Sequence, residues 1–410
     1  MPGKKMNIIE TEDRHGPHTY QKFPIAIVKG KGALVWDDKG REYVDCMGGY
    51  GVAIVGHSNA AVVTAIRRQA ETLITCHGSL YNDARAEFLE TLTRYSPKGL
   101  NAALLSNSGA EAVEVALKLA RKVTGKKGLV AMKGAYHGKT AGALSATWNK
   151  KYKEPFEPLL EGDKHVELGD LSAVEREVDS DVGAVIVEPI QGEGGIMLPP
   201  DGFFRGVREI CDKKGVLLVA DEIQTGLGRT GRLWAMDNWG VVPDVMTLAK
   251  GLAGGVPIGA TVTSAEILGS LKKGEQTSTF GGNPLACAAG TATLNYVVKN
   301  NLPAKAKAKG KVFLDKLKAM GATHKLTREA RGMGLMLAFE LRVAIPNILD
   351  EAMKRGAIFT YSGRTIVRML PPLVITEPQL TRAVKILGKA TAAEEARRAR
   401  GDGGVKDGQD

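Results

Sequence analysis

Three residues that can carry chemistry directly follow short apolar runs of the sequence. Glu188 follows AVIV, Asp221 follows VLLVA, and Lys250 follows VMTLA. Runs of this length and composition are typical of buried strands, and ligands of open α/β sheets bind at the carboxyl ends of the strands. Three such residues in one region of the chain predict a shared site.

Lys250 is the most informative of the three. Most lysines are solvated surface charges, but this one stands between a predicted buried strand and the glycine-rich segment GLAGG. Removal from water lowers the pKa of a lysine and makes its amine nucleophilic, as Schiff-base chemistry requires. Asp221, in VADEIQTG, has two possible roles: it can pair with the protonated pyridine nitrogen of a cofactor, or bind magnesium in a nucleotide-hydrolysing enzyme.

Glycine motifs test the nucleotide-based alternatives. GAYHGKT at 134–140 has one residue too few between its glycines for a phosphate loop. GLGRTG at 226–231 fits the dinucleotide pattern, but Asp221–Thr225 separate it from its strand and a helix is not expected after it. The first observation argues against a nucleotide-hydrolysing enzyme, and the second argues against a nicotinamide-dependent dehydrogenase. SNSGAE at 106–111 begins a predicted helix, which could bind a phosphate or carry an ordinary serine cap.

Helical and short apolar segments alternate through the middle of the chain, which predicts an α/β domain with a largely parallel, buried sheet. The expected strands are Leu129–Met132, Ala184–Glu188, Val216–Ala220 and Val245–Leu248, and the expected helices include Ala110–Val123 and Phe203–Lys213.

The two ends of the chain differ from this pattern. Ile25–Asp45 predicts a hairpin with a turn at Asp38-Lys39-Gly40, and a helical pattern runs from Asn59 to Tyr95. After about Gly290 a basic helical stretch, GMGLMLAFEL and Thr365–Leu370 predict a smaller α+β unit. We therefore expect an N-terminal segment (1–50) that packs with the small domain, a large domain (51–290), a small domain (291–393) and a charged, glycine-rich, disordered tail (394–410).

The chain has a formal net charge of +11, with basic clusters in 118–127, 149–153 and 305–318. A basic surface attracts nucleic acid, anionic lipid or an acidic protein, although charge alone is also consistent with an ordinary solvated surface. The sequence has no nucleic-acid recognition motif and only 5% aromatic residues, which argues against nucleic-acid binding.

The four cysteines form no C-x-x-C pair, so we expect reduced thiols and no metal site. The sequence has no apolar run near the ~18 residues that a membrane span needs. Its start, MPGKKMNIIE, lacks the apolar segment of a secretory signal. These features predict a cytoplasmic protein without membrane contact.

Taken together, the blocks SNSGAEAVEVALKLAR, VEPIQGEGG, VADEIQTGLGRTG, LAKGLAGGVPIGA and STFGGNPLACAA resemble the class III aminotransferases over roughly His15 to Lys389. The resemblance implies a pyridoxal 5'-phosphate (PLP) dependent transaminase of fold type I. In this fold a large domain with a mostly parallel central sheet is joined to a smaller α+β domain. It also implies a homodimer, or a tetramer built from dimers.

By this resemblance, Lys250 forms the Schiff base with PLP and then moves the proton, and Asp221 pairs with the ring nitrogen. The other residues implied at the cofactor are Gly109 and Ala110 (backbone N–H groups to the phosphate), Tyr136 (stacked on the ring), Glu222, Ile223, Gln224 (beside the phenolic oxygen) and Thr279 (to the phosphate of the neighbouring subunit).

The resemblance also implies a substrate site that accepts glutamate or 2-oxoglutarate and a longer amine in turn. Arg368 matches the arginine that clamps a carboxylate, and Glu193 matches the glutamate that pairs with it. Tyr20 and Tyr50 match pocket positions, and Ser278 neighbours the substrate. Lys139 stands where many relatives have arginine, and a lysine lacks the planar fork of that side chain.

A narrower resemblance comes from CMGGYGVAIVGH, HGSLYN and LSATWNKKYKEPFEPL. These segments are similar to transaminases whose substrates are attached to LysW, a small acidic amino-group carrier protein. Those enzymes aminate carrier-bound aminoadipate semialdehyde for lysine biosynthesis or glutamate semialdehyde for arginine biosynthesis. The net charge of +11 agrees with an acidic partner. Acetylornithine and ornithine aminotransferase remain the alternatives.

Overall fold

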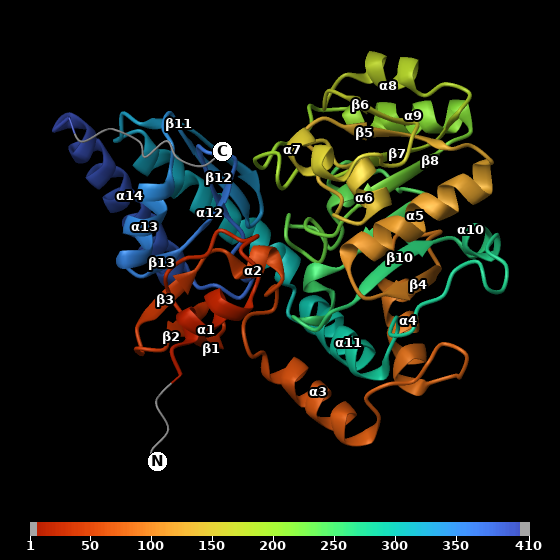
Figure 1. Cartoon of the computed structure of the whole chain (residues 1–410), viewed down its shortest axis with the longest axis horizontal. Coiled ribbons are helices and arrows are strands. Elements are labelled where there is room, and N and C mark those ends of the chain that lie inside the picture. Colours follow the sequence, from red (N-terminus) through yellow and green to blue (C-terminus); the bar gives the residue numbers. More distant parts are fainter. Residues whose placement is uncertain (1–5, 402–410) are drawn as a thin grey trace.

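A central sheet of seven strands organises the computed structural model, which describes residues 6–401 (Figure 1). In spatial order its strands are β4 (Ala102–Ser106), β10 (Gly259–Thr263), β9 (Val245–Leu248), β8 (Leu217–Asp221), β7 (Val182–Val187), β5 (Gly128–Met132) and β6 (Asp163–Val166). Strand β10 runs antiparallel to both of its neighbours, and the other pairs are parallel. The prediction of a mostly parallel sheet is confirmed, and so are the four strands expected from the sequence.

Both faces of this sheet are covered, because successive residues of a strand point to opposite sides. Val130, Val185 and Leu218 pack with helices α8 (Leu171–Glu177) and α9 (Phe203–Lys214). In each of these strands the next residue points to the other face and packs with α5 (Gly109–Thr124) and α6 (Ala141–Ala146). The continuous apolar runs of the sequence therefore reflect burial on two sides.

Further helices surround this core. Helix α11 (Pro284–Lys299) packs on α3 (Ala60–Thr72) and α4 (Asp83–Tyr95). Residues 73–82 interrupt the helical run expected from Asn59 to Tyr95, so that run forms two helices. The short elements α7 (Lys150–Lys153), η1 (Glu154–Phe156), η2 (Ala235–Asn238), η3 (Lys250–Ala253) and α10 (Ala265–Gly269) connect the larger ones.

The two ends of the chain form the part drawn in red and blue in Figure 1. The expected hairpin is confirmed: β1 (Ile27–Lys31), β2 (Leu34–Asp37) and β3 (Glu42–Asp45) are antiparallel, and β13 (Ala357–Ile358) adds to β3 in parallel. A second sheet has the order β11 (Thr327–Met333), β12 (Met336–Leu341), β15 (Ile366–Met369) and β14 (Thr360–Ser362). The remaining helices are α1 (Ile8–His15), α2 (Gly48–Gly51), α12 (Leu302–Gly321), α13 (Pro346–Lys354) and α14 (Glu377–Ala399).

The expectation of a disordered tail from Glu394 onward is wrong for its first part, because α14 continues to Ala399. Glu394 is buried and forms ion pairs with Arg397 at 2.8 Å and with Arg398 at 2.7 Å. Such pairs three and four residues apart neutralise charge along one face of a helix. Residues 402–410 lie outside the described residues. Within 6–401, none of the helices combines the length and the apolar composition that crossing a membrane requires.

Candidate active site

The four adjacent parallel strands β9, β8, β7 and β5 present their carboxyl ends at one edge of the central sheet. Lys250 follows β9, Asp221 ends β8, Glu188 follows β7, and Tyr136 lies in the loop after β5. The structure therefore brings together the three strand-end residues identified in the sequence, and it adds the loop of Tyr136.

Asp221 is buried and accepts two hydrogen bonds. Its Oδ2 lies 2.7 Å from Nδ1 of His137, and its Oδ1 accepts from the backbone N–H of Ile223 at 3.1 Å. A carboxylate only accepts, so the His137 proton sits on Nδ1. Burial lowers the pKa of His137 and the bond to Asp221 raises it, with a net upward direction. His137 was not predicted, although it directly follows Tyr136 in the sequence.

Lys250 begins η3 with a backbone φ of 40°. A side chain other than glycine rarely adopts this region, and such strain concentrates at functional sites. Burial is the main cause that lowers the pKa of Lys250, and the negative charges of Asp221 and Glu188 partly oppose the shift. The amine is thus held closer to its neutral, nucleophilic form.

The first turn of α5 has free backbone N–H groups that could bind an anion. Ser108 caps the helix by accepting from Glu111 N–H at 3.2 Å. The first-turn N–H groups of Gly109 and Ala110 therefore have no acceptor within the helix. A Cβ on Gly109 would lie 2.8 Å from the Ile223 side chain, so only glycine fits where α5 meets the segment after β8.

The segment Ser278–Thr279 lies near this helix start. Ser278 Oγ accepts from Asn107 Nδ2 at 3.2 Å and from Gly281 N–H at 2.9 Å. Thr279 is exposed in the single chain, as is Phe280.

Gln224 and Glu222 lie on either side of Ile223. Gln224 Nε2 approaches Tyr50 O at 3.4 Å, and among the described residues its buried Oε1 has no hydrogen-bond partner. Glu222 is buried and accepts from Met236 N–H at 2.8 Å, and burial raises its pKa to about 7. The Glu222 side chain therefore holds the segment after β8 to the backbone of η2.

Arg368, on β15, is fully buried and pairs with Glu193. Its Nη2 lies 2.7 Å from Glu193 Oε1, and its guanidinium lies 5.5 Å from the ring centre of Tyr50. Nε and Nη1 of Arg368 have no hydrogen-bond partner in the part of the chain that the structure describes. A guanidinium binds a carboxylate bidentately through two parallel N–H groups, and both such pairs in Arg368 include Nη2, the atom that Glu193 holds.

Tyrosines surround this ion pair. Tyr136 packs edge-on against Tyr152, with ring centres 6.2 Å apart, and Lys139 Nζ lies 3.5 Å from the ring centre of Tyr152. Burial lowers the pKa of Lys139 and the charge of Glu193 partly opposes this. Tyr20 is exposed. Tyr152 was not predicted, because sequence alone did not indicate which side of α7 faces the site.

These residues fit PLP. A helix start with free N–H groups suits the phosphate, and a buried carboxylate on β8 suits a protonated ring nitrogen. Gln224 Oε1 and His137 Nε2 are buried and have no hydrogen-bond partner within the described chain. If PLP binds here, Gly109 and Ala110 could hold its phosphate, Tyr136 and Asp221 its ring, and Lys250 the covalent link.

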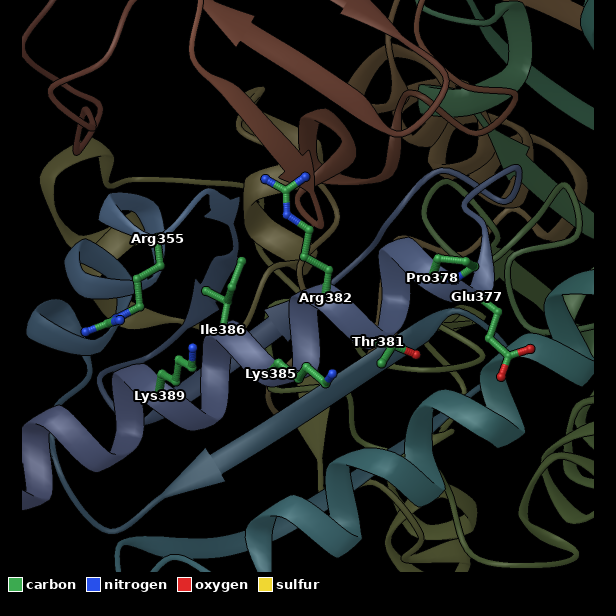
Figure 2. A pocket seen from close by; sticks show the side chains of 8 residues that line it. All are labelled: Arg355, Glu377, Pro378, Thr381, Arg382, Lys385, Ile386 and Lys389. Atoms are coloured by element: carbon green, nitrogen blue, oxygen red, sulfur yellow. The ribbon is translucent and has the colours of Figure 1, made fainter.

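A cavity of about 700 Å³ lies elsewhere, along α14 (Figure 2). It is lined by Arg355, Glu377, Pro378, Thr381, Arg382, Lys385, Ile386 and Lys389, and thus by none of the predicted site residues. Arg382 already pairs with Glu42 at 2.7 Å, and Arg355 with Glu351 at 2.6 Å. This basic cavity is separate from the strand-end site.

The sequence and the fold of this chain are similar to those of known proteins. The family model described as aminotransferase class-III matches residues 15–391. The acetylornithine aminotransferase of Methanopyrus kandleri is 45% identical over 95% of this chain and 100% of its own length. The LysW-aminoadipate semialdehyde transaminase of Deinococcus radiodurans is 40% identical over 94% of this chain and 91% of its own length. The crystal structure of ornithine aminotransferase from Toxoplasma gondii superimposes with a TM-score of 0.91 at 35% identity, covering 95% of both chains.

Proposed function

The chain belongs to the class III aminotransferases, and is thus a PLP-dependent transaminase; from this we propose that it moves an amino group from glutamate to the terminal aldehyde of a semialdehyde attached to LysW. The semialdehyde is that of aminoadipate, and in a second pathway that of glutamate. The Arg368–Glu193 pair is the observation that carries the glutamate part of this proposal. Glu193 occupies one donor of Arg368, and its withdrawal would free the guanidinium for a substrate carboxylate.

The roles of the chain follow from this geometry. Bound PLP supplies an electron sink for the carbon that carries the amino group. Asp221, held by His137, would keep a proton on the ring nitrogen of bound PLP. The Lys250 amine, with its lowered pKa, accepts the proton of the reacting carbon and returns it.

An acidic carrier would find positive charge beside the site. Lys150 and Lys151 are exposed on α7, the helix that carries Tyr152. Lys153 belongs to the same basic cluster but is half-buried and donates to Ser145 O at 2.7 Å. Its role is therefore structural, and the docking surface that we propose includes Lys150 and Lys151 only.

The carrier is tested with the double variant Lys150→Glu and Lys151→Glu. Its matched control reverses two exposed lysines of α12, Lys311 and Lys318. The rate constant kcat/KM for the carrier-bound semialdehyde should fall about tenfold in the α7 variant and little in the control. The glutamate half-reaction should not change in either variant.

Salt gives a second measurement, because the Debye length falls from ~10 Å at 0.1 M to ~3 Å at 1 M. Turnover of the carrier-bound substrate should decrease over this range more steeply than turnover of free N-acetylated semialdehyde. Equal efficiency on both substrates, with the same salt response, would contradict the carrier proposal and leave the second candidate. That candidate is acetylornithine aminotransferase acting on free substrate, which the 45% identity to the M. kandleri enzyme favours.

We also propose that the working unit is a homodimer. Exposed apolar side chains gather near Thr279: Phe280 is 64% exposed, Leu80 65% and Ile74 56%. Arg85 ties these segments together, because it donates to Leu80 O at 2.9 Å and to Gly282 O at 2.7 Å. Such a surface is typical of a protein interface. Analytical ultracentrifugation of the holoenzyme tests this, and a monomer with full activity would contradict it.

A further inference from the structure

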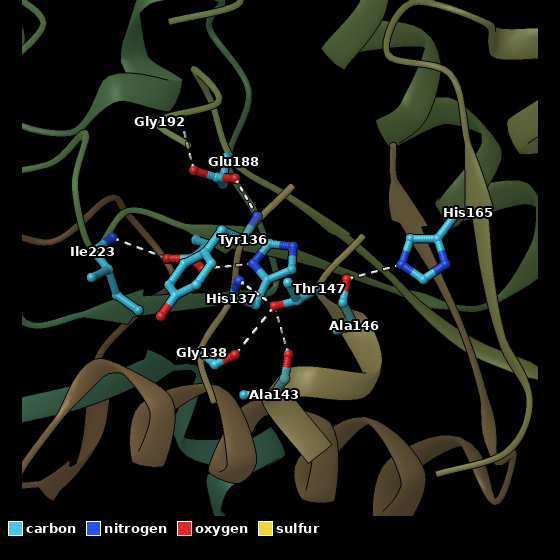
Figure 3. Close-up of polar contacts among 11 residues, drawn as sticks. Tyr136, His137, Gly138, Ala143, Ala146, Thr147, His165, Glu188, Gly192 and Ile223 are labelled. Carbon is cyan, nitrogen blue, oxygen red and sulfur yellow. Dashed lines mark hydrogen bonds and ion pairs between the residues drawn. The ribbon is translucent and has the colours of Figure 1, made fainter. Parts of the chain in front are cut away.

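Glu188 is a buried carboxylate at the edge of the site that holds two separate loops (Figure 3). Its Oε1 accepts from the backbone N–H of Tyr136 at 2.9 Å, and its Oε2 accepts from the backbone N–H of Gly192 at 3.0 Å. The first loop follows β5 and the second follows β7. One carboxylate thus fixes the distance between two segments that are far apart in the sequence.

Each of these loops carries a site residue. The first presents Tyr136 and His137, and His137 holds Asp221. The second places Glu193 directly after Gly192, where Glu193 reaches Arg368. A Cβ on Gly192 would lie 2.2 Å from Gln224 Oε1, so this backbone packs tightly against the cofactor side of the site as well.

The loops have a second connection farther from the site. Gln191 Nε2 donates to Lys133 O at 2.8 Å. This neutral bond keeps the loops near each other without Glu188. Glu188 adds a further connection, which sets the position of the backbone N–H of Gly192, directly before Glu193.

The use of a carboxylate here has a cost. Burial raises the pKa of Glu188 to about 7, and the charge of His137 opposes that shift while the charge of Asp221 adds to it. Removing a charged group from water destabilises a fold unless its partners compensate. A costly group retained at a cluster of functional residues is more readily explained by function than by stability.

We propose that Glu188 is a positioning residue that fixes the loop of Glu193 relative to the loop of Tyr136, and thereby keeps Glu193 paired with Arg368 until a substrate carboxylate displaces it. This inference rests on the proposed exchange of glutamate at Arg368. Glu188 touches neither substrate nor cofactor in this role. It acts through the backbone N–H of Gly192.

The variant Glu188→Gln tests this directly. A glutamine oxygen can accept from one of the two N–H groups, but its amide NH2 then faces the other. The control is Asp244→Asn, at the opposite edge of the same sheet. Asp244 accepts the backbone N–H of Leu218 at 2.7 Å and also pairs with Arg208 at 2.8 Å, so this control loses an ion pair as well. Both variants lose a carboxylate without losing volume.

The first measurement is hydrogen–deuterium exchange of the holoenzyme by mass spectrometry. In Glu188→Gln, exchange should increase together in peptides that cover 133–139 and 189–197, and in Asp244→Asn it should increase in neither. An increase in one loop alone, or in neither, would overturn the coupling. This result does not depend on which substrate the enzyme uses.

The second measurement is the glutamate half-reaction, followed by the absorbance of the cofactor. With Glu193 held less firmly, KM for glutamate in Glu188→Gln should fall about tenfold, the factor typical for loss of a charged hydrogen bond. The saturating rate should change by a smaller factor than KM. A higher KM together with a lower rate would show a merely structural role and overturn the inference. A wild-type enzyme that fails to react with glutamate would instead refute the proposed function.

Discussion

The substitution Asp221→Asn should lower kcat strongly while it changes the stability of the fold only a little. The asparagine oxygen can still accept from Ile223 N–H, as Asp221 Oδ1 does at 3.1 Å. Its NH2 would face His137 Nδ1, which lies 2.7 Å from the present carboxylate. His137 can respond by moving its proton to Nε2, a buried atom without a partner in the described chain. The variant should therefore stay folded, at a cost of about 1–2 kcal/mol.

The chemical cost should be larger. A carboxylate and a protonated ring nitrogen roughly 4 Å apart interact by about 4 kcal/mol at an effective dielectric constant near 20. An amide supplies none of this charge, so the ring nitrogen loses its proton. Since 1.4 kcal/mol is a factor of ten, kcat should fall on the order of 10³-fold. The phosphate and Lys250 contacts remain, so PLP occupancy should stay near that of the wild type.

The assay compares kcat of the glutamate half-reaction with PLP occupancy, read from the cofactor absorbance, and with Tm. Asp244→Asn serves as the control for loss of a carboxylate that accepts a backbone N–H. If Asp221→Asn keeps a normal kcat at full occupancy, Asp221 is not the partner of the ring nitrogen. If PLP is lost instead, the carboxylate serves retention rather than chemistry.

Two further predictions concern lysine and histidine. Lys250→Ala should lower turnover by at least ~10³-fold while PLP binding stays measurable, because the nucleophile and the proton carrier are both removed; near-normal transamination would exclude Lys250. Burial is the main cause that lowers the pKa of His165 to about 4, from an unfolded value near 6.5. The stability that neutral His165 contributes is thus present above pH 6.5 and lost as pH falls toward 4. Between pH 6.5 and 4, the free energy of unfolding of His165→Gln, measured by chemical denaturation, should fall by up to about 3 kcal/mol less than that of the wild type. Parallel curves of unfolding free energy against pH would contradict the argument.

The strand-end site could be predicted from sequence because short, continuous apolar runs mark strands buried on both faces. Strand β10 was not predicted, since GATVT is short and includes two threonines, although all five of its residues are buried. Thr261 Oγ, for example, donates to Ala112 O at 2.8 Å. Likewise β6 consists of the polar residues Asp163, Lys164 and His165 before Val166. Burial of such segments depends on partners distant in the chain, which local patterns do not contain.

The same limit applies to side chains at the site. The positions of Arg368 and Glu193 in the sequence imply a pair only by resemblance to known enzymes, since 174 residues separate them. Tyr152 lies on a four-residue helix, too short for a periodicity to indicate a buried face. Its contact with Lys139 could therefore come only from the structure.

The three carboxylates nearest the reaction differ in how firmly they are held, and this difference decides which of them can move. Asp221 accepts from a histidine and a backbone N–H, and Glu188 accepts from two backbone N–H groups. Both are buried. Glu193 pairs through one oxygen with Arg368, and its side chain is 33% exposed. Its carboxylate can exchange that bond for water, and a substrate carboxylate would then replace it at the buried guanidinium of Arg368, whereas withdrawal of either of the other two would leave buried donors unpaired. A site that must bind a substrate carboxylate at Arg368 in one half-reaction and exclude it in the other needs one movable acid on a fixed frame, and Glu193 alone of these three meets that condition.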